Sequence, residues 1–246
     1  MNTTKIGFFD SGIGGATVLK ECLKINPDFE YVFFSDSINN PYGDKEPEEI
    51  KKITENITKY LINENCKIIV IACNTASAIA SNYLREKFKD VKFVAIEPAI
   101  KLAYNIKGST LVMATKGTLD SEKFHNLYNE YHTEECYLMP CVGLANLIEC
   151  GDEEQIDAYL KEHLNKYNNI KNVVLGCTHY PLVKNKIKEI LNCENILDGS
   201  LGVAKQLNRI IMQNGYLPNN DDDKKIKFID SSNSKEKEKR FYNFIK

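Results

Sequence analysis

Residues 68–75 read IIVIACNT, and residues 172–179 read NVVLGCTH. Both segments have the same design: an apolar run ends in a small residue, which is followed by cysteine and then by amide or hydroxyl side chains. A short apolar run without polar alternation is typical of a strand covered on both faces, as in a parallel sheet. Because ligands bind at the carboxyl ends of such strands, the repeated design predicts that Cys73 and Cys177 point into ligand-binding crevices.

Other apolar runs alternate with segments of helical period along the chain. Strands are expected at 6–9, 31–34, 93–96, 110–113 and 227–229, and helices near 16–24, 47–63, 76–87 and 182–191. Strands that alternate with helices predict an α/β fold, with mostly parallel sheets flanked by helices.

The spacing of the two cysteine motifs predicts two similar lobes. The motifs lie about 100 residues apart, the size of a small domain, so each lobe would contribute one thiol to an active site in the cleft between them. The first lobe is expected to comprise residues 1–97 and 207–246, and the second residues 98–206, with Pro98 at the first crossing. The polar segment 219–225 is expected to be an exposed turn.

The composition excludes several classes of protein. The 246 residues include 32 Lys plus Arg and 34 Asp plus Glu, a net charge of −2, so the chain has no large cationic field to hold nucleic acid. The alternating charges of residues 235–240 predict a solvated helix face. The chain begins without a signal-peptide pattern, and no apolar run reaches the length of a membrane span. These features favour a soluble, cytoplasmic protein with no membrane partner.

The eight cysteines do not form a metal-binding or disulfide framework. None belongs to a C-x-x-C pair, and no paired Cys and His spacing indicates zinc, so no metal site is expected. In a cytoplasmic chain they are expected to be reduced, and most of them to be small buried apolar groups.

The two cysteines that follow strands suit proton transfer. The N–H groups at a helix N-terminus stabilise a thiolate, so a cysteine there can have a pKa below its ordinary value of about 8.5 and act as a base. The same N–H groups, with the side chains of Asn74, Thr75 and Thr178, would bind a carboxylate. Two thiols in matching frames predict that one removes a proton from carbon while the other returns a proton on the opposite face.

Other readings of these motifs are weaker. A single thiol with His179 would suggest acyl transfer, but no triad is evident. The glycines after Asp10 could form a dinucleotide-binding loop, but Thr17 stands where that motif needs its third glycine. Asp10, Asn74, Thr75 and Thr178 could simply cap helices, and His179 could be an ordinary core histidine.

A series of segments resembles the motif series of the glutamate racemase family. They occur in the family's order at 10–15 (DSGIGG), 40–43 (NPYG), 72–76 (ACNTA), 115–118 (TKGT), 176–182 (GCTHYPL) and 198–200 (DGS). The resemblance spans nearly the whole chain, and the two cysteine motifs together with the opening Asp-Ser-Gly segment make it specific.

The resemblance implies a function and a set of site residues. The reaction would interconvert L- and D-glutamate without a cofactor or metal, and would supply D-glutamate for peptidoglycan synthesis and cell shape. Cys73 and Cys177 would exchange the α-proton, assisted by Asp10 and His179, and the enzyme would be a homodimer. The residues implied to bind the substrate are Asp10, Ser11, Pro41, Tyr42, Gly43, Asn74, Thr75, Thr118, Glu149, Thr178 and His179.

One segment departs from the family pattern and leaves the substrate open. Many relatives place two prolines and a phenylalanine between the positions of Cys141 and Glu149, whereas this chain reads CVGLANLIE there. The segment is expected near the cleft, so an acidic amino acid such as aspartate is an alternative substrate. A protein that binds an amino acid without turning it over is a further alternative.

Overall fold

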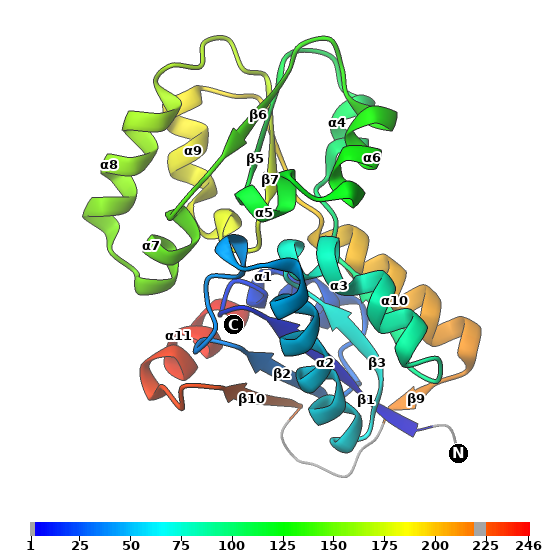
Figure 1. Cartoon of the computed structure of the whole chain (residues 1–246). Coiled ribbons are helices and arrows are strands. Elements are labelled where there is room, and N and C mark those ends of the chain that lie inside the picture. The colour runs from blue at the N-terminus through cyan, green and yellow to red at the C-terminus, as the bar shows by residue number, and fades with distance from the viewer. Residues whose placement is uncertain (1–2, 219–224) are drawn as a thin grey trace.

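Two parallel sheets, each flanked by helices, form two lobes (Figure 1). The computed structural model describes residues 3–218 and 225–246. The predicted α/β architecture with two lobes is confirmed. The expected turn at 219–225 lies outside the described residues except for Lys225.

The first lobe is built on the order β10-β2-β1-β3-β4, with β9 beside the start of β1. Each pairing is parallel, and Phe8 of β1 lies between Phe33 of β2 and Val70 of β3. The strand bounds are β1 Thr3–Asp10, β2 Tyr31–Ser35, β3 Cys66–Ile71, β4 Lys92–Ala95, β9 Leu217–Pro218 and β10 Ile226–Asp230.

Helices cover both faces of this sheet. On one face lie α1, α10 and α11, and on the other α2 and α3. Their bounds are α1 Ala16–Ile25, α2 Pro47–Asn63, α3 Asn74–Lys87, α10 Ser200–Asn214 and α11 Lys235–Ile245, and a 3-10 turn η1 spans Tyr42–Asp44. Burial on both faces explains why β1 and β3 have continuous apolar runs rather than alternating ones.

The second lobe has the parallel order β6-β5-β7-β8. The strands are β5 Thr110–Ala114, β6 Cys136–Pro140, β7 Asn172–Gly176 and β8 Asn195–Leu197. Helices α7, α8 and α9 pack on one face, and α4 and α6 on the other. The bounds are α4 Ile100–Tyr104, α5 Lys116–Leu119, α6 Glu122–Tyr131, α7 Leu144–Cys150, α8 Glu153–Leu164, the 3-10 turn η2 Tyr180–Val183 and α9 Lys184–Leu191.

Helix α10 spans one of the expected lobe boundaries. It begins at Ser200, before the expected division at 206/207, and its side chains Val203, Ala204 and Leu207 join the core of the first lobe. The exact lobe boundaries stay a prediction.

The charged segment 235–240 is only partly a solvated face. Lys235 and Lys239 are exposed, but Lys237 and Arg240 are partly buried and contact α7 of the other lobe. The prediction of a solvated face was therefore wrong for these two residues. Within the described ranges, no helix is both long and apolar enough to cross a membrane.

Candidate active site

Cys73 lies where β3 passes into α3. Its backbone is extended, as is usual for the residue before a helix, and its Sγ accepts a hydrogen bond from the Ala76 N–H at 3.5 Å. The thiol also donates to Ser11 Oγ at 3.8 Å. The first thiol thus occupies a helix N-terminus, as predicted.

Cys177 occupies the equivalent position after β7 in the second lobe. The last residue of that strand is Gly176, where a Cβ would lie only 2.8 Å from the Ala114 Cβ, so a side chain there would force a shift. No α-helix begins at Cys177, since the chain forms the 3-10 turn η2 from Tyr180 first. Its polar partner is instead His179, whose Nδ1 lies 3.7 Å from the Cys177 Sγ.

His179 links Cys177 to a buried carboxylate. The His179 Nε2 lies 2.7 Å from Glu149 Oε2, and both side chains are at most 2 % exposed. Burial alone would lower the pKa of His179, but its hydrogen bonds with Cys177 and Glu149, and their charges, raise it well above its ordinary value. The raised pKa favours a protonated imidazole beside the Glu149 carboxylate.

The glycine-rich segment after β1 packs directly on this pair. The Ile13 N–H donates to Glu149 Oε2 at 3.0 Å. A Cβ at Gly12 would lie 2.5 Å from Glu149 Oε2, and a Cβ at Gly14 would lie 2.7 Å from His179 Nδ1. These glycines therefore bring the first lobe's backbone against the acid–base groups of the second, a role other than nucleotide binding.

Asp10 is the acidic group of the first lobe. It is fully buried at the end of β1, where Oδ2 accepts from the Gly15 N–H at 2.6 Å and from Thr178 Oγ1 at 3.1 Å. Its Oδ1 has no hydrogen-bond partner among the described residues. Burial raises the pKa of Asp10, although the charge of His179 opposes this.

The expectation that a helix N-terminus lowers the pKa of Cys73 was wrong for this structure. Complete burial raises the pKa of the Cys73 thiol well above its ordinary value, the charge of Asp10 adds to this, and the hydrogen bond from Ala76 only partly opposes it. The charge of Cys177 adds a smaller contribution in the same direction. Burial outweighs the helix terminus because desolvation penalises the thiolate directly.

Of the polar residues predicted to hold carboxylates, Asn74 has the most available side chain. It is 4 % exposed, and neither its amide oxygen nor its nitrogen has a partner among the described residues. Thr75 instead contacts Thr115 at 2.9 Å and Thr118 at 3.2 Å, and Thr178 is engaged with Asp10.

The loop that follows β2 reaches the second lobe. Tyr42, the first residue of η1, is buried and donates to Asp36 Oδ2 at 2.6 Å, and the Asn40–Pro41 peptide bond just before it is cis. A Cβ at Gly43 would lie 3.0 Å from the Thr115 Cβ. Of the predicted residues 41–43, Gly43 therefore lies beside the hydroxyl cluster of Thr75, Thr115 and Thr118.

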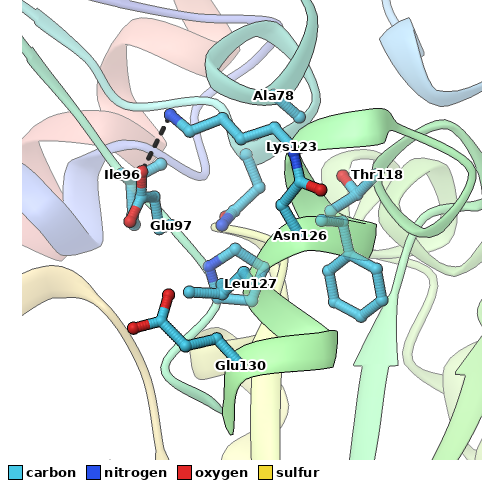
Figure 2. Close-up of a pocket in the computed structure, with 11 residues that line it drawn as sticks. Ala78, Ile96, Glu97, Thr118, Lys123, Asn126, Leu127 and Glu130 are labelled. Atoms are coloured by element: carbon cyan, nitrogen blue, oxygen red, sulfur yellow. Dashed lines mark ion pairs between the residues drawn. The ribbon is translucent and has the colours of Figure 1, made fainter. Parts of the chain in front are cut away.

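A cavity of about 160 Å³ lies where α3 meets α6 (Figure 2). Asn74 and Thr118 line it, and the ion pair between Lys123 and Glu97, at 2.8 Å, stands at its side. Neither thiol lines this cavity. It therefore adjoins the predicted substrate-binding residues but not the reacting groups.

The structure brings the predicted residues into two connected groups and adds others. Asp10, Ser11 and Cys73 come from the first lobe, while Cys177, His179 and Glu149 come from the second. The sequence interpretation missed Lys237 and Arg240, although their spacing with Phe241 and Phe244 places all four on one helix face. Within the described residues, no group of three His, Cys, Asp or Glu side chains is arranged to hold a metal ion.

The fold and the motif series agree with known sequences. The family model for Asp/Glu/hydantoin racemases matches residues 20–205, three quarters of the chain. The chain belongs to this racemase family. It is therefore an isomerase of the racemase class, and the predicted family resemblance is confirmed.

Several relatives are glutamate racemases. The chain is 45 % identical over 222 residues to one from Clostridium perfringens, covering 87 % of this chain and 85 % of that protein. One from Clostridium botulinum is 42 % identical over 237 residues, covering 93 % and 92 %. The Francisella tularensis enzyme in complex with D-glutamate superposes with a TM-score of 0.85 at 30 % identity, covering 100 % of this chain and 94 % of that one.

Proposed function

We propose that this racemase interconverts L- and D-glutamate, with Cys73 and Cys177 as the two proton-transfer groups. The observation that supports the proposal is that each lobe contributes one buried cysteine shortly after a parallel strand, with Cys73 beside Ser11 and Cys177 beside His179. The relatives named glutamate racemase, which match over nearly their whole length, support glutamate as the substrate.

Each thiol would transfer one proton. A thiolate removes the α-proton and becomes a thiol, and the resulting carbanion takes a proton from the opposite thiol, which becomes the thiolate. The configuration at carbon is inverted, and atoms and charge balance without a net change in the enzyme's protonation. Burial raises the pKa of Cys73, which suits it to donate a proton, and His179 Nδ1, 3.7 Å from the Cys177 Sγ, is placed to assist proton transfer at Cys177.

The remaining residues would bind the substrate and tune the thiols. The buried, unpartnered amide of Asn74 suits the α-carboxylate, because a ligand would satisfy a group that is costly to bury alone. The unpartnered Oδ1 of Asp10, with Ser11 beside Cys73, suits the ammonium group. The side-chain carboxylate would lie beside Pro41, toward the backbone N–H groups of Tyr42 and Gly43 and the hydroxyls of Thr75 and Thr118. Thr178 and Glu149 would act through Asp10 and His179 rather than by touching substrate.

The biological role we propose is the supply of D-glutamate for peptidoglycan, in the cytoplasm and as a homodimer, with no cofactor. The family resemblance supports these assignments. Light scattering of the purified protein tests the dimer, because a single species with the mass of one chain would contradict it.

Single-cysteine variants test the proposed chemistry. Cys73→Ala and Cys177→Ala should each lose racemisation of glutamate, while Cys150→Ala, which changes an exposed cysteine, should retain it. Circular dichroism with glutamate, aspartate and other amino acids, without added metal or cofactor, measures the rates. Wild-type turnover of aspartate in preference to glutamate would overturn the substrate assignment, and an active Cys73→Ala or Cys177→Ala enzyme would overturn the two-thiol assignment.

A further inference from the structure

Helix α11, the last helix of the first lobe, contacts Glu149 of the second lobe. Helix α11 packs on α1 and β10, and it lies beneath α7 in Figure 1. From this helix, Lys237 Nζ lies 2.9 Å from Glu149 Oε1. Arg240 donates to the backbone carbonyls of Ile148, at 3.0 Å, and of Glu149.

These contacts complete the surroundings of one buried carboxylate. Glu149 is 2 % exposed, and its Oε2 accepts from Ile13 N–H and pairs with His179. Its Oε1 pairs with Lys237. A buried carboxylate is stable in its charged form only when its partners are in place, so Lys237 fixes both the charge and the orientation of Glu149.

Arg240 fixes the helix that carries Glu149. Its two contacts are with carbonyls in the last turn of α7, at the negative end of the helix dipole. The guanidinium therefore anchors the end of α7 to the first lobe. Lys237 acts on the Glu149 side chain and Arg240 on its backbone.

The Cys73 side of the site has no equivalent contact with α11. Its partners are Ser11 Oγ and the Ala76 N–H, both in the first lobe, together with the charge of Asp10. Among the described residues, the direct contacts that run from Lys237 through Glu149 and His179 lead to Cys177.

We propose that Lys237 is a positioning residue for the Cys177 side of the reaction, acting through Glu149 and His179 across the two lobes. The proposal rests on the proposed two-thiol function. It makes the C-terminal helix part of the proton-transfer apparatus for one thiol and not for the other.

The two directions of a racemisation have an equilibrium constant of one, so kcat/KM must stay equal for L- and D-glutamate in any variant. Comparing kcat/KM for the two enantiomers therefore cannot show which thiol a substitution affects. The rates of the two proton-transfer steps can show it. If the transfer at Cys177 is slowed, α-deuterium on the enantiomer that Cys177 deprotonates should give a larger isotope effect on kcat/KM. The opposite enantiomer should give a smaller one, because its first step at Cys73 is no longer limiting.

The variant is Lys237→Met, which removes the charge and keeps most of the side-chain volume. Lys239→Met, at an exposed position of the same helix, is the matched control, and Lys237→Arg is the conservative variant. We expect Lys237→Met to lower kcat/KM for glutamate about tenfold, because the charge that pairs with the buried Glu149 is removed. The isotope effects for the two enantiomers should move in opposite directions, and Lys237→Arg should restore both rate and isotope effects.

A second measurement does not depend on the substrate. Mass spectrometry of iodoacetamide-treated protein gives separate alkylation rates for Cys73 and Cys177. Lys237→Met should slow alkylation at Cys177 severalfold relative to Cys73, because the loss of a positive charge beside Glu149 and the misplacement of His179 both disfavour a thiolate there. Thermal unfolding of each variant identifies any general loss of structure.

The outcomes separate the two proposals. Wild-type protein without glutamate turnover would contradict the proposed function, while the alkylation rates would still test the link from Lys237 to Cys177. An active wild type whose Lys237→Met variant changes both isotope effects alike, or alkylates both thiols in the wild-type ratio, would overturn the positioning role. Equal effects of Lys239→Met and Lys237→Met would overturn it as well.

Discussion

Replacing Gly14 by alanine should disable the site without removing any catalytic group. The new Cβ would lie 2.7 Å from His179 Nδ1 and 2.9 Å from two ring carbons, whereas ordinary contacts begin at 3.4 Å. The imidazole would have to retreat by about 0.7 Å, and it is held on its other side by Glu149 at 2.7 Å. Its 3.7 Å contact with Cys177 is then lost.

The expected cost to kcat/KM for glutamate is about 100-fold, since misplacement of a reacting group by about 1 Å has an effect of this size. Overpacking should also lower the free energy of unfolding by about 1–3 kcal/mol. Circular dichroism measures the rate, and urea denaturation the stability. Gly202→Ala is the control, because nothing lies within 4 Å of a Cβ there. A Gly14→Ala enzyme with the wild-type rate would refute the placement of His179 against this backbone.

Two further predictions concern stability. Burial alone would raise the pKa of Glu149, but His179 and Lys237 lower it from 4.5 to about 2. The ion pairs of Glu149 therefore stabilise the folded state above pH 4.5. This contribution to the free energy of unfolding is lost as the pH falls from about 4.5 to about 2. Urea denaturation across this range should show a steeper loss for wild type than for Glu149→Gln, and identical slopes would contradict the assignment. The Phe241 side chain is fully buried, and its ring centroid lies 4.3 Å from that of Phe228 and 4.7 Å from that of Phe33. Phe241→Ala should lower the free energy of unfolding by about 3–5 kcal/mol. The control Met212→Ala, at an exposed position, should lower it by less than about 0.5 kcal/mol. Similar losses in both would contradict the packing of α11.

The central strands β1, β3, β5 and β7 gave the clearest signal in the sequence. Helices cover both faces of these strands, so each has a continuous apolar run. Such a run can be recognised in a single sequence. The edge strand β6 was not predicted. Its residues Tyr137 and Leu138 are exposed, and Pro140 at its end is a residue that disfavours strand structure. The edge strand β8, Asn195–Leu197, is too short to give a period.

Site residues that closely follow a strand could be predicted from the sequence, whereas contacts between residues far apart in the sequence could not. Cys73, Cys177 and His179 follow buried strands, so the topology alone places them. The ion pair of Lys237 with Glu149 joins residues far apart in sequence, and a lysine in an alternating charged helix looks like any solvated one. The raised pKa of Cys73 also depends on burial, which arises only when both lobes are folded.

The most direct test of the two-thiol account is the fate of the α-proton in D₂O. Wild-type protein is incubated with L-glutamate, and early in the reaction both enantiomers are separated and examined by NMR. The account predicts that newly formed D-glutamate carries deuterium at the α-carbon while the remaining L-glutamate keeps its proton, because different thiols serve the two faces. Deuterium appearing in L-glutamate as fast as in D-glutamate would contradict it, since a single base would then serve both faces.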